Sequence, residues 1–87
     1  MSIAALRLAV RAAGGQSALA RAIGGPVKQA HVWAWLNRNT KVPADYCPAI
    51  ERATGVRCDD LREDLDWLRN EADEVVSYCV HIDREGA

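Results

Sequence analysis

Residues 16–38 of the 87-residue chain, QSALARAIGGPVKQAHVWAWLNR, contain two short segments with helical periodicity on either side of a Gly24-Gly25-Pro26 break. In each segment apolar residues recur on one helix face. The core of the pair is expected to consist of Leu19, Ala20, Ile23, Val32 and Trp35. This pattern predicts a helix-turn-helix, although similar corners occur in small helical bundles that do not bind DNA.

Several side chains of the second segment are expected to point outward and are suited to contact DNA. They are Lys28, Gln29, Ala30, Trp33, Ala34, Asn37 and Arg38. The Gln29 amide can form a bidentate contact with an adenine edge, which discriminates between bases by about 1–3 kcal/mol. We expect Lys28 and Arg38 to contact phosphates, and we extend this expectation to Arg21 and Lys41.

Two tryptophans of this segment are predicted to have different environments. Trp33 and Trp35 are two residues apart, and this spacing places them about 200° apart on a helix. Trp35 shares its face with Val32 and is predicted to be buried. Trp33 is therefore predicted to be exposed, where it touches a thymine methyl group, covers sugar-phosphate or contacts a second subunit.

The overall net charge of −1 conceals a strong asymmetry. Residues 1–50 carry six Lys and Arg residues against one Asp, which gives +5. Residues 51–87 carry five Arg residues against eleven acids, which gives −6. Because local cations supply the electrostatic part of DNA binding, we expect the amino-terminal half to meet nucleic acid. The alternative is a solvated charge distribution without a partner.

Composition narrows the class of protein further. One small domain is expected, and its core would gain from self-association. Cys47, Cys58 and Cys79 lack metal-ligand spacing, and His31 and His81 lie far apart, so we assign no metal and no cofactor and expect a reducing compartment. No nucleophile accompanies a base, so no enzymatic activity is expected. Without a membrane-length apolar run or a secretory pattern, the chain is expected to be soluble and cytoplasmic.

Glycine and proline positions predict the order of the helices. A first helix is expected over residues 2–13, a second from Gln16, and a third from about Val27 with Pro26 in its first turn. The polar residues 37–41 are expected to form a loop.

A fourth helix is expected to begin at Pro43 and to end before Gly55. Pro48 lies inside this segment. It either kinks the helix or marks its true start.

Beyond Val56, apolar residues recur at helix-like spacings of 4, 3, 4, 3 and 4. They are Leu61, Leu65, Leu68, Ala72, Val75 and Cys79. This pattern favours a helix to about residue 72, packed at first on the domain and then available to a second subunit. The expected dimer contacts are Leu68, Ala72, Val75 and Cys79.

The competing interpretation takes residues 75–82, VVSYCVHI, as a strand that pairs across a dimer. The choice between helix and strand is therefore left open for residues 73–82.

The predicted fold class is all-α, a small bundle of four to five helices. We expect a DNA-binding domain over residues 1–72 and a carboxy-terminal tail over residues 73–87 that serves dimerisation.

Three segments together resemble the Cro-like helix-turn-helix regulators of prophage origin, and most closely the YdaS-type group that is often labelled antitoxin. These segments are AGGQSALARAIGGPVKQAHVWAWL, VPADYCPAIERATG and DDLREDLDW. The resemblance covers residues 6–67, and its combined pattern is specific, whereas LARAIG alone would be weak evidence.

The resemblance implies a lambda-repressor or Cro-like fold whose third helix enters the major groove of a pseudo-palindromic operator bound by a dimer. It implies that Gln16 contacts phosphate and braces Gln29. It also implies that three residues face the bases, namely Ala30, Trp33 and Ala34. Asn37 is implied to contact the DNA backbone.

We therefore predict a Cro-like repressor of a prophage or toxin–antitoxin operon that binds double-stranded DNA. It would act in the cytoplasm of a bacterial or phage-infected cell, associated with the nucleoid. The alternative is an antitoxin or interaction module that binds a toxin or another protein through its acidic carboxy-terminal segment. Both functions are compatible in one chain.

Overall fold

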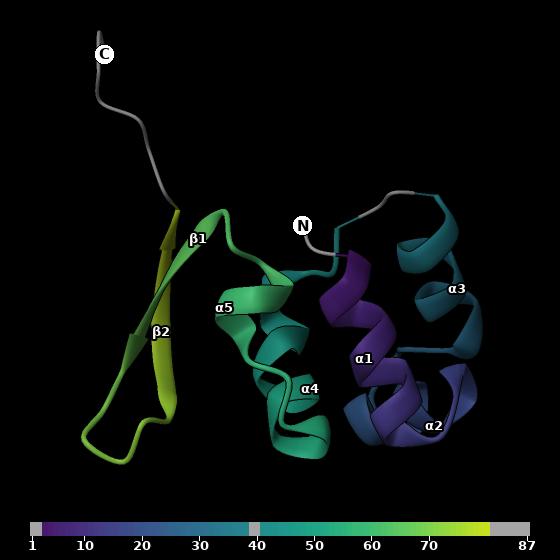
Figure 1. The fold of residues 1–87 in the computed structure, drawn as a ribbon, viewed down its shortest axis with the longest axis horizontal. Helices are drawn as coiled ribbons and strands as arrows, with labels where there is room; N and C mark the ends of the chain where they lie inside the picture. Colours follow the sequence, from purple (N-terminus) through teal and green to yellow (C-terminus); the bar gives the residue numbers. More distant parts are fainter. Residues whose placement is uncertain (1–2, 39–40, 81–87) are drawn as a thin grey trace, which may run out of the picture.

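The structure is a computed structural model that describes residues 3–38 and 41–80. Its helices are α1 (Ile3–Ala13), α2 (Gln16–Ile23), α3 (Gln29–Asn37), the short 3-10 helix η1 (Ala44–Tyr46), α4 (Cys47–Thr54) and α5 (Cys58–Leu61). Two strands follow, β1 (Leu65–Arg69) and β2 (Val75–Val80). Figure 1 shows α3 and the strand pair at opposite ends of the molecule, with the other helices between them.

The first three helices follow the predicted order, with one shifted start. Gly14 and Gly15 have φ angles of 101° and 130°, a conformation that L side chains rarely adopt, and they separate α1 from α2. The third helix begins at Gln29, two residues after the predicted start, because Lys28 is extended with φ −118° and ψ 166°. Pro26 therefore lies in the turn before α3, and its predicted place in the first helical turn is wrong.

The second interpretation of Pro48 is confirmed. The fourth helix begins at Cys47, which places Pro48 in its first turn, where the missing N–H is not needed. The residues from Ala44 to Tyr46 form η1 instead of the start of one kinked helix. Gly55 ends α4 in the left-handed conformation, with φ 80°.

One apolar core joins the five α-helices. The fully buried side chains include Leu6 of α1, Leu19 of α2, Val32 of α3 and Ile50 of α4. Ala20 and Trp35 are also buried, while Ile23 is partly buried against the same core. The Trp35 ring packs on Tyr46 at a centroid distance of 6.2 Å, which connects α3 to η1.

The predicted helix over the heptad-like segment to residue 72 is wrong. Leu65–Arg69 forms a strand that pairs antiparallel with Val75–Val80. Burial in β1 alternates from buried Leu65 and half-buried Trp67 to exposed Asp66 and Leu68, a strand period of two instead of a helical period. Over residues 3–38 and 41–80 the fold is therefore mostly helical, with five α-helices and a small antiparallel sheet, and the all-α expectation is corrected.

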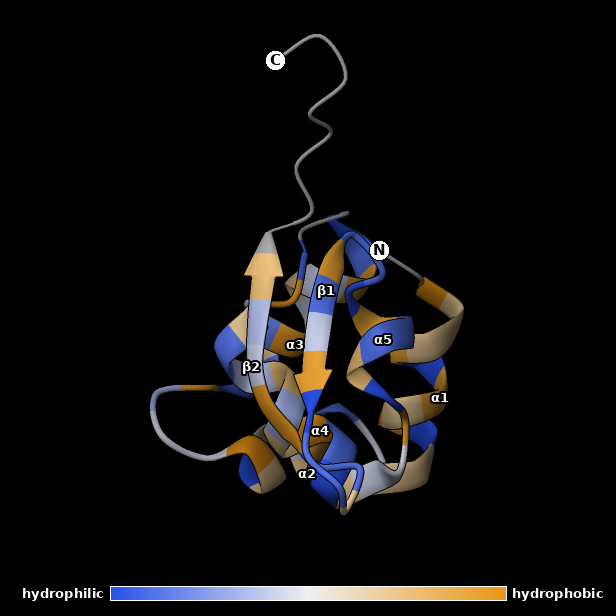
Figure 2. Cartoon of the chain, turned by 90° about the vertical axis from the view of Figure 1, so that its left-hand side faces the viewer, coloured by the Kyte–Doolittle hydropathy of each residue, from blue (hydrophilic) through white to orange (hydrophobic). Residues whose placement is uncertain are grey.

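The strand interpretation of the carboxy-terminal segment is confirmed for residues 75–80, while residues 81 and 82 lie outside the described residues. Its partner is β1 of the same chain, in the register Trp67 to Tyr78. Figure 2 shows the two strands side by side in front of the helices. The hairpin spans the domain boundary that we expected at residue 72.

Arg69 ties this hairpin to the helices. Its guanidinium donates hydrogen bonds to both carboxylate oxygens of Glu51 in α4, at 2.7 and 3.0 Å. It also bonds Asp59 in α5 at 2.5 Å and the carbonyl oxygen of Asp73 at 2.7 Å. Its side chain is 12% exposed and that of Glu51 is 20% exposed, so solvent has limited access to this pair, whereas Asp59 and Asp73 are exposed. The hairpin position therefore depends on contacts between residues far apart in the chain.

Candidate nucleic-acid interface

The first residues of α2 and α3 are joined by a side-chain hydrogen bond. Nε2 of Gln29 donates to Oε1 of Gln16 at 2.6 Å. Gln29 is exposed and Gln16 is half-buried, and the bond joins residues that are thirteen positions apart in the chain. The bracing of Gln29 by Gln16 that the family resemblance implies is therefore present in the structure.

The outward face of α3 is open to solvent along its length. The exposed residues of this face are Lys28, Gln29, Ala30, Trp33, Asn37 and Arg38, and Ala34 is half-buried. Val32 and Trp35 point into the core from the other side. This arrangement separates the buried side of the helix from a face that carries two amides, two cations, two small residues and an aromatic ring.

Trp33 and Arg38 form a stacked pair at the end of α3. The Arg38 guanidinium carbon lies 5.6 Å from the centre of the Trp33 ring, and 43% of Trp33 is exposed. Asn37 Nδ2 donates to the carbonyl oxygen of Trp33 at 2.9 Å, one helical turn earlier. The ring therefore holds a planar cation at the surface.

His31 has a structural role that the sequence analysis missed. Its Nδ1 accepts a hydrogen bond of 2.9 Å from the backbone N–H of Lys28, the residue that caps α3. The side chain thus satisfies a donor just outside the first helical turn, as Glu does at the third position of a capping box. The three-residue spacing between Lys28 and His31 was the available signal.

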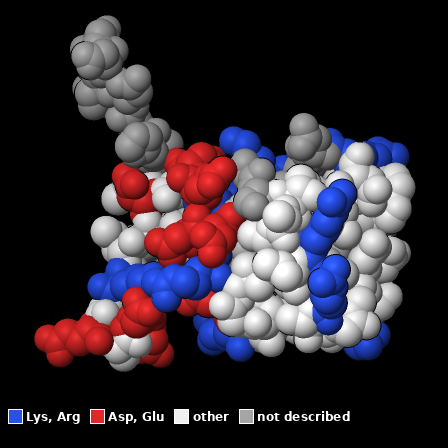
Figure 3. All heavy atoms as spheres, viewed as in Figure 1, with Lys and Arg blue, Asp and Glu red and all other residues white. Residues whose placement is uncertain are grey.

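The Lys and Arg residues of the two halves of the chain differ in how many of them form ion pairs. Among the described residues, Arg7, Arg11, Arg21, Lys28 and Arg38 make no ion pair. In the second half Arg57, Arg62 and Arg69 bind carboxylates, and Arg52 makes no ion pair with any described residue. Lys41 lies 3.3 Å from Asp64, so this candidate phosphate contact is already partnered. Figure 3 shows Asp and Glu gathered over α5 and the hairpin, and only Lys and Arg as charged groups on the visible face of the other end.

Comparison with known proteins places this arrangement in a family. Residues 6–70 match the family described as bacterial toxin YdaS. The chain belongs to the YdaS family. It is also 50% identical over 56 residues to the protein of Escherichia coli strain K12 named "Putative transcriptional regulator YdaS". No solved structure matches the chain.

The YdaS match runs from α1 through β1 and ends before β2. The aligned segment is 62% of this chain and 55% of the relative, so the chain spans about half the length of the curated relative it matches. The YdaS-type group expected from the sequence is confirmed. The family description names a toxin, whereas the name of the relative names a regulator.

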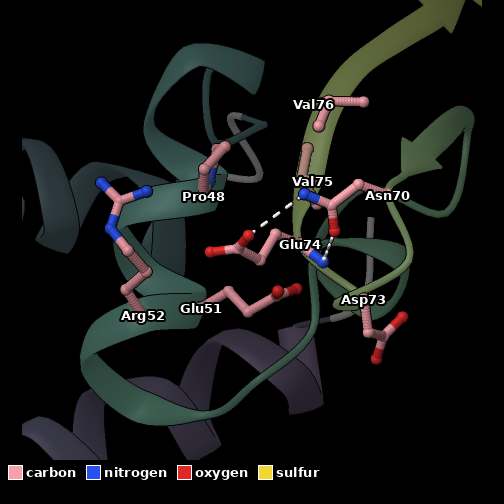
Figure 4. A pocket seen from close by; sticks show the side chains of 8 residues that line it. All are labelled: Pro48, Glu51, Arg52, Asn70, Asp73, Glu74, Val75 and Val76. Atoms are coloured by element: carbon pink, nitrogen blue, oxygen red, sulfur yellow. Dashed lines mark hydrogen bonds between the residues drawn. The ribbon is translucent and has the colours of Figure 1, made fainter.

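The YdaS fold does not bring the expected dimer contacts together on one helix. Leu68 and Cys79 are exposed on the hairpin, Ala72 lies in its turn, and Val75 packs partly against the core. A hollow of about 240 Å³ separates the hairpin from α4, and Figure 4 shows Asn70 hydrogen bonded to Glu74 at its edge. The acidic side chains here belong to a face remote from α3.

The YdaS-family chain holds two of its thiols in the core. Cys47 and Cys58 are buried, and burial raises the pKa of each thiol to about 12, whereas Cys79 is exposed. Within residues 3–38 and 41–80, no three His, Cys, Asp or Glu side chains are grouped to hold a metal ion. No helix of this described part has the length and apolar character to cross a membrane.

Proposed function

We propose that this chain is a transcriptional regulator that binds double-stranded DNA in a sequence-specific manner, as a Cro-like repressor. The observation that carries the proposal is the hydrogen bond of Gln29 to Gln16 on the open face of α3. It holds a base-reading amide at the start of a helix that has room to enter the major groove. The regulator name of the relative from E. coli supports the same function.

The polarity of this hydrogen bond suits DNA. Because Oε1 of Gln16 accepts from Gln29, the Gln16 amide nitrogen is left to donate, and a phosphate can only accept. Gln29 retains its carbonyl oxygen and one N–H, the donor and acceptor pair that an adenine edge requires. Lys28 and Arg38, which have no ion-pair partner among the described residues, would contact phosphates on either side.

The test is a fluorescence anisotropy titration of labelled duplex from the region upstream of the gene, with random duplex as competitor and salt varied. We expect binding that resists the competitor and falls steeply with salt. Binding to both duplexes with equal affinity would remove sequence specificity from the proposal. Failure to bind either duplex would overturn it.

We further propose that the regulator binds as a dimer formed by the hairpin. The sheet has two strands, so the outer edge of β2 has no strand partner within the described part of the chain. Strand Val75–Val80, VVSYCV, carries none of the charged residues or prolines that usually protect an edge. Sedimentation equilibrium of the wild-type chain should show a dimer. The variant Ser77→Pro should be a monomer that retains the helical core. A wild-type chain that is monomeric at every concentration would contradict the proposal.

A second candidate function is binding of a protein partner through the same end of the molecule. Val76 is 62% exposed and Tyr78 39% exposed beside a hollow of about 260 Å³ that also contains Trp67 and Asp45. Co-expression with the product of a neighbouring gene tests this candidate. Val76→Lys should abolish co-purification, while Leu8→Lys, at another exposed apolar residue, should not.

A further inference from the structure

A second cationic surface lies on α1, outside the residues assigned to DNA binding above. Arg7 and Arg11 line a hollow of about 510 Å³ together with Val10, Leu36 and the two glycines before α2. Both arginines are exposed. No Asp or Glu lines the hollow, and neither arginine forms an ion pair with any described residue. Two guanidinium groups are therefore available to an anionic partner.

This hollow borders both α3 and the start of α2. One of its walls is Leu36 of α3, and another is Gly15, the residue directly before Gln16. Gln16 in turn is hydrogen bonded to Gln29. A nucleic-acid strand that passes Gln16 would therefore reach the arginines of α1 without leaving the surface of the protein.

The spacing of the arginines suits separate phosphates. Arg7 and Arg11 are four residues apart on a helix, which is about 6 Å along the helix axis and places them on nearly the same face. Arginine is well matched to phosphate oxygens because its planar guanidinium presents several donors. The hollow is open to solvent and contains no buried polar side chain, which suits an extended polyanion better than a small enclosed ligand.

We propose that Arg7 and Arg11 contact backbone phosphates of the DNA strand held by Gln16, so that the footprint extends from α3 onto α1. This inference rests on the proposed DNA-binding function. The arginines add affinity and salt dependence but read no bases. They are contacts that extend the interface beyond the helix-turn-helix itself.

The experiment compares the full chain with the variant Arg7→Gln/Arg11→Gln. Binding to the upstream duplex and to random duplex is measured by anisotropy at several salt concentrations. The control is Arg52→Gln, which removes one positive charge, half of that removed by the double variant, from an exposed arginine of α4 beside the hairpin. Thermal melts establish that all variants are folded at the assay temperature.

We expect the double variant to lose about 1.8 units of the slope of log K against log salt, or about 0.9 per phosphate contact. Both duplexes should be weakened by the same factor, Arg52→Gln should keep the wild-type slope, and Arg7→Lys/Arg11→Lys should restore most of it. An unchanged slope in the double variant, or an equal loss of slope in Arg52→Gln, would overturn the inference. Sequence-specific binding that depends on Gln29 would then still support the proposed function. Absence of duplex binding by the wild-type chain would overturn the proposed function as well.

Discussion

Gln29 donates a 2.6 Å hydrogen bond from Nε2 to Oε1 of Gln16, thirteen residues earlier in the chain. The bond restricts two long side chains that would otherwise rotate freely in solvent. An amide that is already oriented loses less entropy when it binds a base, so the pair prepares Gln29 for recognition. The bond also assigns different tasks to the two residues, because only Gln16 keeps both N–H groups free.

Gln16→Glu should separate bracing from phosphate contact. The glutamate still accepts the hydrogen bond of Gln29, but it places a negative charge where Gln16 would donate to phosphate. We expect weaker binding to operator and random duplex alike. Gln29→Ala should instead lower operator affinity by about 1–3 kcal/mol and leave random binding nearly unchanged. Anisotropy titrations measure both variants against both duplexes. An operator-only loss in Gln16→Glu, together with an equal loss on both duplexes in Gln29→Ala, would contradict these roles.

Arg38→Ala should weaken binding to all sequences and reduce the salt slope by about 0.9, because it removes one phosphate contact. Trp33→Leu leaves the cation but removes the ring on which it stacks, an interaction of about 0.5–1 kcal/mol at an exposed site. We therefore expect Trp33→Leu to reduce affinity with little change in the salt slope. A large loss of specificity in Trp33→Leu would instead indicate that the ring contacts a base.

Acid should loosen the hairpin through Glu51. The Arg69 hydrogen bonds, together with the bond from the Cys58 backbone N–H, lower the pKa of Glu51 from 4.5 to about 2. A lowered pKa in the folded state stabilises the protein above pH 4.5, and this contribution is lost as the pH falls toward 2. Because solvent still screens the pair, we expect about 1 kcal/mol.

Urea unfolding of Glu51→Gln measures this contribution. The variant should be less stable than wild type at pH 7, and the difference should disappear as the pH approaches 2. Glu63→Gln is the matched control, since Glu63 is exposed and makes no ion pair within the described part of the chain. A constant difference between Glu51→Gln and wild type from pH 7 to 2 would show that the carboxylate charge is not responsible.

The three thiols should react at different rates. Burial raises the pKa of Cys47 and Cys58 to about 12, so both remain protonated and inaccessible at pH 8, while Cys79 is exposed. We expect one fast-reacting thiol with Ellman's reagent in the native protein and three in denaturant. Cys79→Ser should remove the fast phase. Fast reaction of two thiols in native protein would show that the core opens near α4 and α5.

The helix pair was predictable because its determinants are local. The burial of Leu19, Val32 and Trp35 follows from helical periodicity, and the glycines that separate the helices are visible in the sequence. In the structure α3 begins two residues later than the sequence predicts. The backbone N–H of Lys28, just before the helix, donates to the side chain of His31, and the apolar pattern does not reveal this contact. The outward position of Trp33 also followed from its spacing to Trp35.

The segment after α5 was not predictable in the same way. The positions Leu61, Leu65 and Leu68 suit a helix, while Leu65, Trp67 and Arg69 suit a strand with every second residue inward. Trp67 Nε1 donates to the Arg62 carbonyl oxygen at 3.0 Å, which helps to fix the strand orientation. The two patterns overlap, so the pattern alone could not decide between them.

The sequence by itself determined the first three helices, the apolar core between them, the charge asymmetry and the YdaS family. Helices satisfy their backbone hydrogen bonds within one segment, so their signals are contained in a few consecutive turns. Only the tertiary structure decided that residues 65–69 form a strand instead of continuing a helix. A strand needs a partner for its backbone groups, here residues 75–80, and an anchor such as the Arg69 contact with Glu51, eighteen residues away.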